Sequence, residues 1–139
     1  MSGEEVAGFL AEERTVICAT NGRDGFPHLM PLWYVVRHPP FGGQEAELWS
    51  WTFAKSQKAR NLKRDPRATL QVEAGREYSD LRGVMLKTDV TIHRDTELVA
   101  EFGIELFAAS PPGSTTIPAR WCSRRRPSAW CCSSASARG

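Results

Sequence analysis

The chain of 139 residues contains no run of about 18 or more apolar residues, so the sequence predicts no transmembrane helix. Its first residues include Glu4, Glu5, Glu12 and Glu13 in place of the basic segment that opens a secretory signal, which favours a cytoplasmic protein. The four cysteines include no CxxC pair, so we expect no zinc site and assign no metal ligand. The length suits a single domain with a modest core.

The common catalytic and dinucleotide-binding motifs are absent as well. The sequence has no Ser/His/Asp arrangement, no paired-carboxylate signature and no GxGxxG loop. This absence fits an enzyme whose chemistry is carried out by a bound cofactor, and it equally fits a protein without catalytic activity. We therefore assign no catalytic residue from the sequence.

Acidic residues are missing from residues 119–139, which hold five arginines. The formal net charge of +2 comes from this segment, because the rest of the chain has 13 basic and 16 acidic residues. A slightly acidic body argues against a nucleic-acid-binding domain. We expect neither nucleic acid nor a membrane as a partner.

The spacing of apolar residues predicts a mainly β (α+β) domain with five strands, most of them joined as hairpins. We expect the strands over residues 15–20, 26–37, 47–53, 68–73 and 82–93. Helices are expected over residues 3–13, directly after Ser56, and after Asp95, which caps the third helix. Pro27 and Pro31 remove ladder donors, so the second strand must be edge-like or bulged there. Without βαβ periodicity, the economical architecture is a small antiparallel barrel with helices outside.

Residues 48–72 organise the rest of the chain, because they read as strand, tight turn, short basic helix and strand. Ser56 is placed to cap the helix, and Pro66 stops it. Lys55 and Lys58 flank the helix start, where backbone donors and two ammonium groups together favour a phosphate. The simpler alternative is that both lysines are solvated charges on a surface helix.

Residues 111–139 differ in character from residues 1–110, which we take as the folded domain. Arginine, serine, cysteine and tryptophan are mixed in this tail without apolar periodicity. We interpret the tail as the product of a frameshift, because GC-rich codons for residues 127–134 reread in the next frame encode an apolar, strand-like run. The alternative is a natural disordered tail. In both cases we expect the barrel to lack its last strand and to leave an open sheet edge.

Three segments carry a resemblance to a known family: residues 24–33 (DGFPHLMPLW), 48–52 (LWSWT) and 56–67 (SQKARNLKRDPR). In this order they resemble the pyridoxamine 5'-phosphate oxidase-like split β-barrel proteins, and within them the actinobacterial branch that uses the deazaflavin coenzyme F420. The resemblance covers residues 3 to about 110. It implies a split antiparallel β-barrel and a homodimer whose cofactor lies across the subunit interface.

The resemblance also implies a cofactor site made of the matching residues and the neighbouring Lys55: Met30, Pro31, Leu32, Trp51, Thr52, Lys55, Ser56, Gln57 and Lys58. The segment over residues 30–32 would line the cofactor ring largely through its backbone. Gln57 departs from the family pattern, because the FMN-dependent oxidases usually place arginine there. Losing that cation weakens the phosphate site for FMN, so we favour F420, whose tail carries phosphate and glutamates.

These observations predict an oxidoreductase that uses F420 or FMN to transfer hydride to or from a small organic substrate. Three alternatives stay open at this point. The protein could be a cofactor-binding carrier or sensor without turnover, or a nucleic-acid-binding module built on residues 55–67, which the acidic body disfavours. It could also be an inactive, truncated paralogue that does not complete its barrel.

Overall fold

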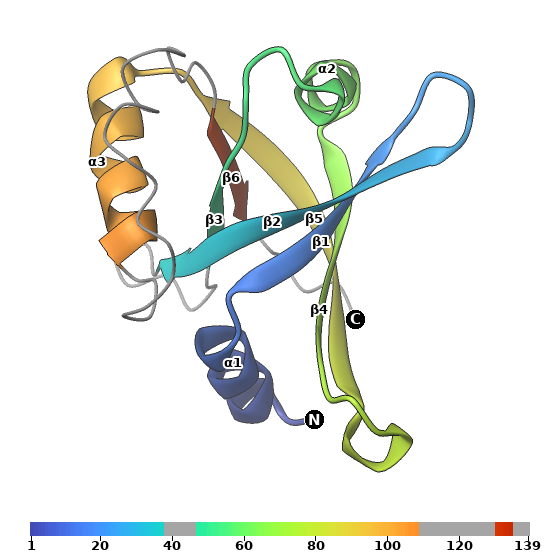
Figure 1. The fold of residues 1–139 in the computed structure, drawn as a ribbon. Coiled ribbons are helices and arrows are strands. Elements are labelled where there is room, and N and C mark those ends of the chain that lie inside the picture. The colour runs from blue at the N-terminus through green and yellow to red at the C-terminus, as the bar shows by residue number, and fades with distance from the viewer. Residues whose placement is uncertain (38–46, 109–129, 135–139) are drawn as a thin grey trace.

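A computed structural model describes residues 1–37, 47–108 and 130–134 (Figure 1). The elements, in chain order, are α1 (Gly3–Glu12), β1 (Thr15–Asn21), β2 (Pro27–Arg37), β3 (Glu47–Trp51), α2 (Gln57–Arg64), β4 (Arg67–Ala74), the 3-10 helix η1 (Tyr78–Asp80), β5 (Arg82–His93), α3 (Thr96–Ala108) and β6 (Trp130–Ser134). The strands pair antiparallel and close into a barrel in the order β1-β2-β3-β6-β5-β4. The expected mainly β fold with helices outside the barrel is confirmed.

The helices begin where local capping chemistry predicts. Ser2 and Glu5 form the reciprocal capping box of α1, in which each side chain accepts from the other's backbone N–H. Ser56 Oγ accepts from the backbone N–H of Ala59 at 3.3 Å and caps α2. Asp95 Oδ1 accepts from two backbone N–H groups in the first turn of α3, at 2.9 and 3.1 Å. Each cap satisfies donors that a helix start leaves without an intrahelical partner.

Side chains fill the inside of the barrel. The main cluster of buried apolar residues comes from α1, α2 and strands β1 to β5: Phe9, Leu10, Val16, Cys18, Tyr34, Leu48, Leu62, Ala68, Leu70, Val72, Leu86 and Val90. Tyr34 keeps its hydroxyl satisfied by donating to the carbonyl oxygen of Leu10 at 2.8 Å. The cavity that the described side chains of β1 to β5 enclose inside the barrel is about 10 Å³. It holds at most about one water molecule, so these side chains leave no space for a larger ligand among them.

Helix α3 covers the outer surface of β2 and β3 (Figure 1). Its buried residues Val99, Phe102 and Leu106 pack on three half-buried side chains: Val35, Trp49 and Trp51. The neighbours of the two tryptophans along β3, Leu48 and Ser50, are buried on the barrel side. The side chains of β3 therefore alternate between the barrel interior and α3.

Strand β2 changes partners along its length. Residues Pro27 to Trp33 pair with β1, while pairing with β3 begins only at Tyr34. Among the described strands, residues Pro27 to Trp33 therefore have a hydrogen-bonded neighbouring strand on one side only. This confirms that β2 is edge-like at Pro31, where a missing N–H costs no interstrand hydrogen bond on that side. The half-open edge leaves this part of β2 accessible.

A sixth strand, β6, lies where the sequence predicted an open sheet edge. It pairs with β3 and β5, with Cys131 opposite both Ser50 and Ile92. Two neighbouring ladder edges need backbone partners, and an extended segment supplies them whatever its side chains are. Residues 38–46, 109–129 and 135–139 lie outside the described residues. The domain boundary and the frameshift therefore stay predictions.

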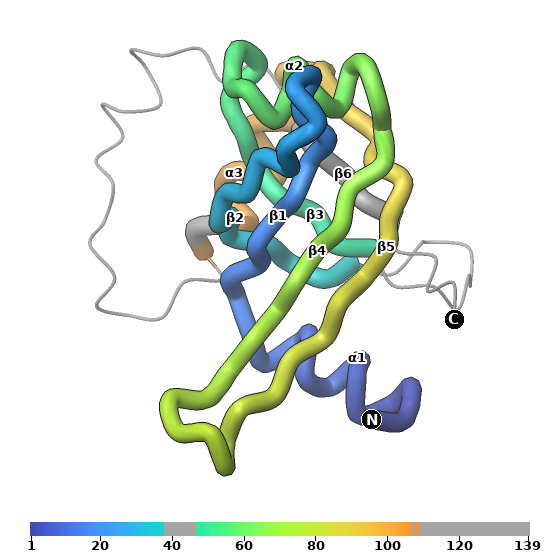
Figure 2. The backbone as a smooth tube through the Cα atoms, turned by 90° about the vertical axis from the view of Figure 1, so that its right-hand side faces the viewer, coloured from blue at the N-terminus to red at the C-terminus, as the bar shows by residue number. Residues whose placement is uncertain are grey.

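The β4–β5 hairpin extends beyond the barrel toward the end that carries α1 (Figure 2). Helix α2 lies at the opposite end of the molecule (Figure 1). None of the helices in the described ranges has both the length and the apolar character needed to cross a membrane. The two ends of the barrel are thus chemically distinct, with the basic helix at one of them.

We expect Phe102→Ala to lower the free energy of unfolding by about 3–5 kcal/mol, because it removes a fully buried ring between α3 and the barrel. Denaturant unfolding followed by tryptophan fluorescence measures this change. Ile104→Ala on the same helix is the control, since Ile104 is 72% exposed and its truncation should cost no more than about 0.5 kcal/mol. Equal losses in the two variants would contradict the packing of α3.

Candidate functional site

Three of the predicted site residues meet at the start of α2. Lys58 Nζ donates a hydrogen bond to Thr52 Oγ1 at 2.7 Å, and the hydroxyl oxygens of Thr52 and Ser56 lie 3.3 Å apart. Lys58 is only 7% exposed. A cation, two hydroxyl groups and a helix N-terminus therefore form one cluster, which we call the α2 corner. Its groups are those that bind phosphate oxygens in proteins.

Lys58 points toward the barrel and Lys55 toward solvent. The ammonium group of Lys58 acts on the buried thiol of Cys18: burial raises the pKa of Cys18 to about 11, and Lys58 opposes this rise. The alternative of a solvated surface lysine therefore describes the exposed Lys55 but not Lys58. Cys18 lies opposite Met30 in the β1–β2 ladder. The α2 corner is thus close to the segment predicted to line a cofactor ring.

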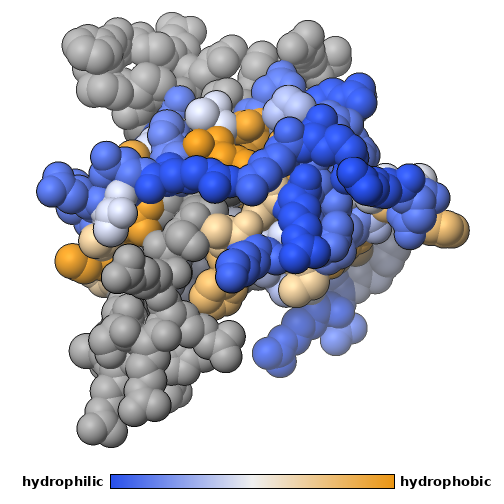
Figure 3. All heavy atoms as spheres, turned by 90° about the horizontal axis from the view of Figure 1, so that it is seen from above, coloured by the Kyte–Doolittle hydropathy of each residue, from blue (hydrophilic) through white to orange (hydrophobic). Residues whose placement is uncertain are grey.

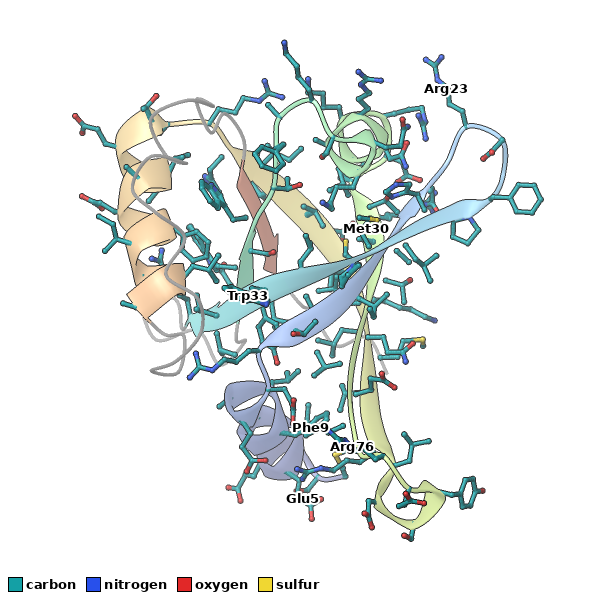
Figure 4. All side chains as sticks on the ribbon, in the orientation of Figure 1. Glu5, Phe9, Arg23, Met30, Trp33 and Arg76 are labelled. Carbon is teal, nitrogen blue, oxygen red and sulfur yellow. The ribbon has the colours of Figure 1, made fainter. Side chains whose placement is uncertain are left out.

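The predicted ring residues differ in exposure. Met30 is 43% exposed and Pro31 is exposed, on the part of β2 that pairs only with β1. Leu32 is half-buried and lines the small cavity inside the barrel. Met30 lies where β2 crosses β1, on the side of the molecule below α2 (Figure 4). Met30 and Pro31 are therefore both accessible to a ligand, on opposite faces of β2, and Leu32 shares the face of Met30 and lines the interior.

Trp51 and Gln57 lie beside the α2 corner rather than in it. Trp51 packs on α3 with Trp49, whereas Thr52, the next residue, is buried at the corner. Gln57 is exposed, and its amide donates to Asn61 Oδ1 at 2.9 Å, which turns the side chain along the helix. The structure thus brings together Thr52, Ser56 and Lys58, and it places the other two on neighbouring surfaces.

Asn61 is the residue that sequence reasoning missed. It is fully buried, and its Nδ2 donates to Thr20 Oγ1 at 3.1 Å, which ties α2 to β1. Arg64 reinforces this attachment by donating to the carbonyl oxygen of Asn21. One signal was available in the sequence, since Asn61 lies three residues after Lys58 and directly before Leu62, on the side of the helix away from Arg60 and Lys63.

Asp65, at the end of α2, extends the same attachment. Its carboxylate accepts from Asn21 Nδ2 at 2.8 Å and from Arg67 Nε and Nη2 at 2.9 and 2.8 Å. These hydrogen bonds, led by those from Arg67, hold the pKa of Asp65 well below its usual range. The carboxylate stays ionised at neutral pH and fixes the junction between α2, β1 and β4.

Two hollows of about 520 Å³ each lie next to this junction, within the size range of small-molecule sites. The first is lined by residues of β1, β4 and β5: Asn21, Arg67, Ala68, Thr69, Lys87, Thr88 and Asp89. The second is lined by α2 and the β1–β2 hairpin: Arg23, Gln57, Arg60, Lys63 and Arg64. Most of the residues that line the two hollows therefore carry charged or polar side chains.

A small antiparallel barrel whose interior is full, with a phosphate-type corner outside it, defines a class of ligand-binding barrel proteins. Residues 2–130 match the family described as pyridoxamine 5'-phosphate oxidase, and the chain belongs to this family. A conserved hypothetical protein from Mycobacterium tuberculosis is 33% identical, with a TM-score of 0.76 over 98% of this chain and 81% of that one. The comparison with curated proteins finds no match.

More distant solved structures share the fold. A FAD-binding protein from Mesorhizobium loti is 17% identical, with a TM-score of 0.66 over 97% of this chain and 90% of that one. The heme storage protein from Vibrio cholerae is 16% identical, with a TM-score of 0.61 over 99% of this chain and 91% of that one. The predicted family and split-barrel fold are confirmed, while the ligands of these relatives differ from one another.

We expect Asn61→Leu to destabilise the protein by about 2 kcal/mol, because it leaves the buried hydroxyl of Thr20 without its amide donor. Chemical denaturation measures the loss. Arg60→Leu is the matched control on the exposed side of the same helix, with an expected change within about 0.5 kcal/mol. An Asn61→Leu variant as stable as the parent would show that α2 is held in some other way.

Proposed function

We propose that this protein is a cytoplasmic oxidoreductase that binds F420 or FMN and transfers hydride to or from a small organic substrate. The observation that carries the proposal is the α2 corner, where the Lys58 ammonium group is buried beside Thr52 and Ser56 at a helix start. Burying a cation is costly, and sites that keep one are commonly functional. The family to which the chain belongs supports a flavin-type ligand.

The residues present fit the phosphate end of such a cofactor. Lys58 supplies charge, the hydroxyl groups of Thr52 and Ser56 supply donors, and the N-terminal end of α2 adds a favourable dipole. All of these groups belong to one turn and one helix, so the corner is already formed before any ligand arrives. A preformed site binds at a lower entropic cost than one that must be ordered.

The ring end would lie on the outside of β2, at Met30 and Pro31. The filled interior leaves no room for a ring inside the barrel, and β2 is open along this half. Backbone groups of an edge-like strand can hydrogen-bond a ligand in place of a neighbouring strand. The bound cofactor supplies the hydride chemistry, and the chain's own residues bind it and orient it.

Gln57 supports the choice of F420 over FMN. Its amide is hydrogen-bonded to Asn61 and carries no charge, so it adds no cation to the phosphate end. The similarity to a FAD-binding protein supports a flavin-type ligand in general but does not separate the two cofactors. A direct comparison of the protein's affinities for F420 and for FMN separates the two cofactors.

A non-catalytic carrier or sensor is the second candidate. The heme storage protein from Vibrio cholerae has the same fold, which supports a storage or carrier role on this type of barrel. Both candidates predict that the purified protein binds a cofactor. Consumption of the reduced cofactor in the presence of a substrate separates them, because only the enzyme turns over.

We further propose that the protein is a homodimer built on the outer face of β1, β2, β4 and β5. Pro31, Ile17, Gln71 and Met85 form one row across these four strands, on the face away from the core. In the described part of the chain, α1 and α3 pack elsewhere on the barrel. A second copy covering this face would also border the exposed edge at Met30, which places the cofactor beside the interface.

We expect Lys58→Met to weaken binding of F420 by about 30-fold, or about 2 kcal/mol, because it removes the only charged group of the α2 corner and keeps the apolar stem. Titration of F420 and of FMN, each followed by the quenching of tryptophan fluorescence, measures the two affinities.

Arg76→Met is the control for that titration, since it removes one exposed cation at the far end of the molecule (Figure 4). Its affinity for both cofactors should equal that of the parent protein. Thermal melting must show that both variants are folded. An unchanged affinity in folded Lys58→Met would remove the phosphate role from Lys58, and tighter binding of FMN than of F420 would reverse our choice of cofactor.

We expect the parent chain to sediment at twice its 15.5 kDa monomer mass and Met85→Glu to sediment as a monomer. A carboxylate in the middle of an apolar interface is left without solvent or a partner. Ile104→Glu is the matched control, because Ile104 is equally apolar and exposed but lies on α3. If Met85→Glu stays dimeric, the interface lies on another surface.

A further inference from the structure

The second hollow described above is lined by four cationic side chains and one amide, and we call it the basic groove: Arg23, Gln57, Arg60, Lys63 and Arg64. The ion pairs among the described residues are Arg37–Glu105, Arg67–Asp65 and Arg82–Glu12, and none includes a cation of the groove. Seen from the α2 end, the molecule presents mainly hydrophilic side chains (Figure 3). The groove therefore concentrates positive charge on a chain whose residues 1–118 are slightly acidic.

The wall of the groove formed by α2 is fixed to the barrel. Arg64 donates to the carbonyl oxygen of Asn21 and lies 3.5 Å from Asn61 Oδ1, so one cation is already oriented. Arg60 lies four residues before Arg64, about one turn earlier on the same face of the helix. Arginine in such a fixed position presents planar donors that match phosphate and carboxylate oxygens.

The opposite wall, the β1–β2 hairpin with Arg23 at its tip, is also rigid (Figure 4). Gly22 N–H donates to the carbonyl oxygen of Phe26 at 3.1 Å, and Asp24 Oδ1 accepts from Phe26 N–H at 3.1 Å. A Cβ atom at Gly22 would lie 2.4 Å from the Phe26 carbonyl oxygen, so only glycine allows this closure. Arg23, which lines the groove, therefore projects from a closed hairpin rather than from a long flexible loop.

We propose that the basic groove is a binding site for a small oligoanion, meaning a molecule that carries two or more phosphate or carboxylate groups in a row. Four like charges around one hollow repel one another, and a multivalent anion relieves more of this repulsion than a single chloride does. A nucleic acid fits less well, because the acidic remainder of the body repels a long polyanion. The proposal goes beyond the cofactor site, since the groove contains no cation of the α2 corner and shares with the predicted cofactor residues only the uncharged Gln57.

Calorimetric titration with tripolyphosphate and with a tetraglutamate peptide tests the proposal. At about 10 mM salt the screening length is about 30 Å, so charge contacts are close to their full strength. We expect saturable binding of at least one of the two probes with one site per chain. Arg60→Gln should weaken it by about five-fold, the size of one exposed charge contact, and Arg60→Gln with Lys63→Gln by about 25-fold.

Arg76→Gln is the matched control, because it removes the same charge from an exposed position at the opposite end of the molecule (Figure 4). It should leave the affinity for both probes unchanged. A preference for one probe identifies the ligand as a phosphate or a carboxylate chain. The proposal is overturned if neither probe saturates, if Arg76→Gln weakens binding as much as Arg60→Gln, or if duplex DNA binds more tightly than both probes.

Discussion

The buried amide of Asn61 is the contact on which the functional end of this molecule depends. Because it is fully buried, its polar atoms need partners, and Thr20 on β1 and Gln57 supply them. Rotation of α2 by one residue would break the bond to Thr20 and leave the amide N–H group of Asn61 without that acceptor, at a cost of about 1–3 kcal/mol. This contact therefore fixes which side of a strongly cationic helix faces the barrel.

That orientation places the cationic side chains of α2 on two different surfaces. Lys58 is turned inward, where it meets Thr52 and the buried thiol of Cys18. Arg60 and Arg64 are turned outward, where they border the basic groove. One helix can thus offer two separate anion sites, because successive residues of an α-helix point in directions about 100° apart. The inward charge is buried, whereas the outward charges are exposed.

In this chain, the packed interior of the barrel separates the residues that stabilise the fold from those that are free to face a ligand. The interior keeps a cavity of about 10 Å³, so it determines stability and leaves binding to the outer surface. A FAD-binding protein and a heme storage protein share this architecture at 17% and 16% identity. Surface residues can change without disturbing a packed core, which lets one scaffold support several functions. For this reason the α2 corner, and not the barrel, carries the proposed function.

The sequence by itself determined the local structure: the caps at Ser56 and Asp95, the alternation along β3 and the stop at Pro66. These depend on neighbours a few residues apart, so spacing alone reveals them. Only the tertiary structure decided that Lys58 is buried while Lys55 is exposed, and that β6 closes the barrel. Both outcomes depend on residues distant in the chain, such as Asn61 and Thr20, whose contact no local pattern encodes.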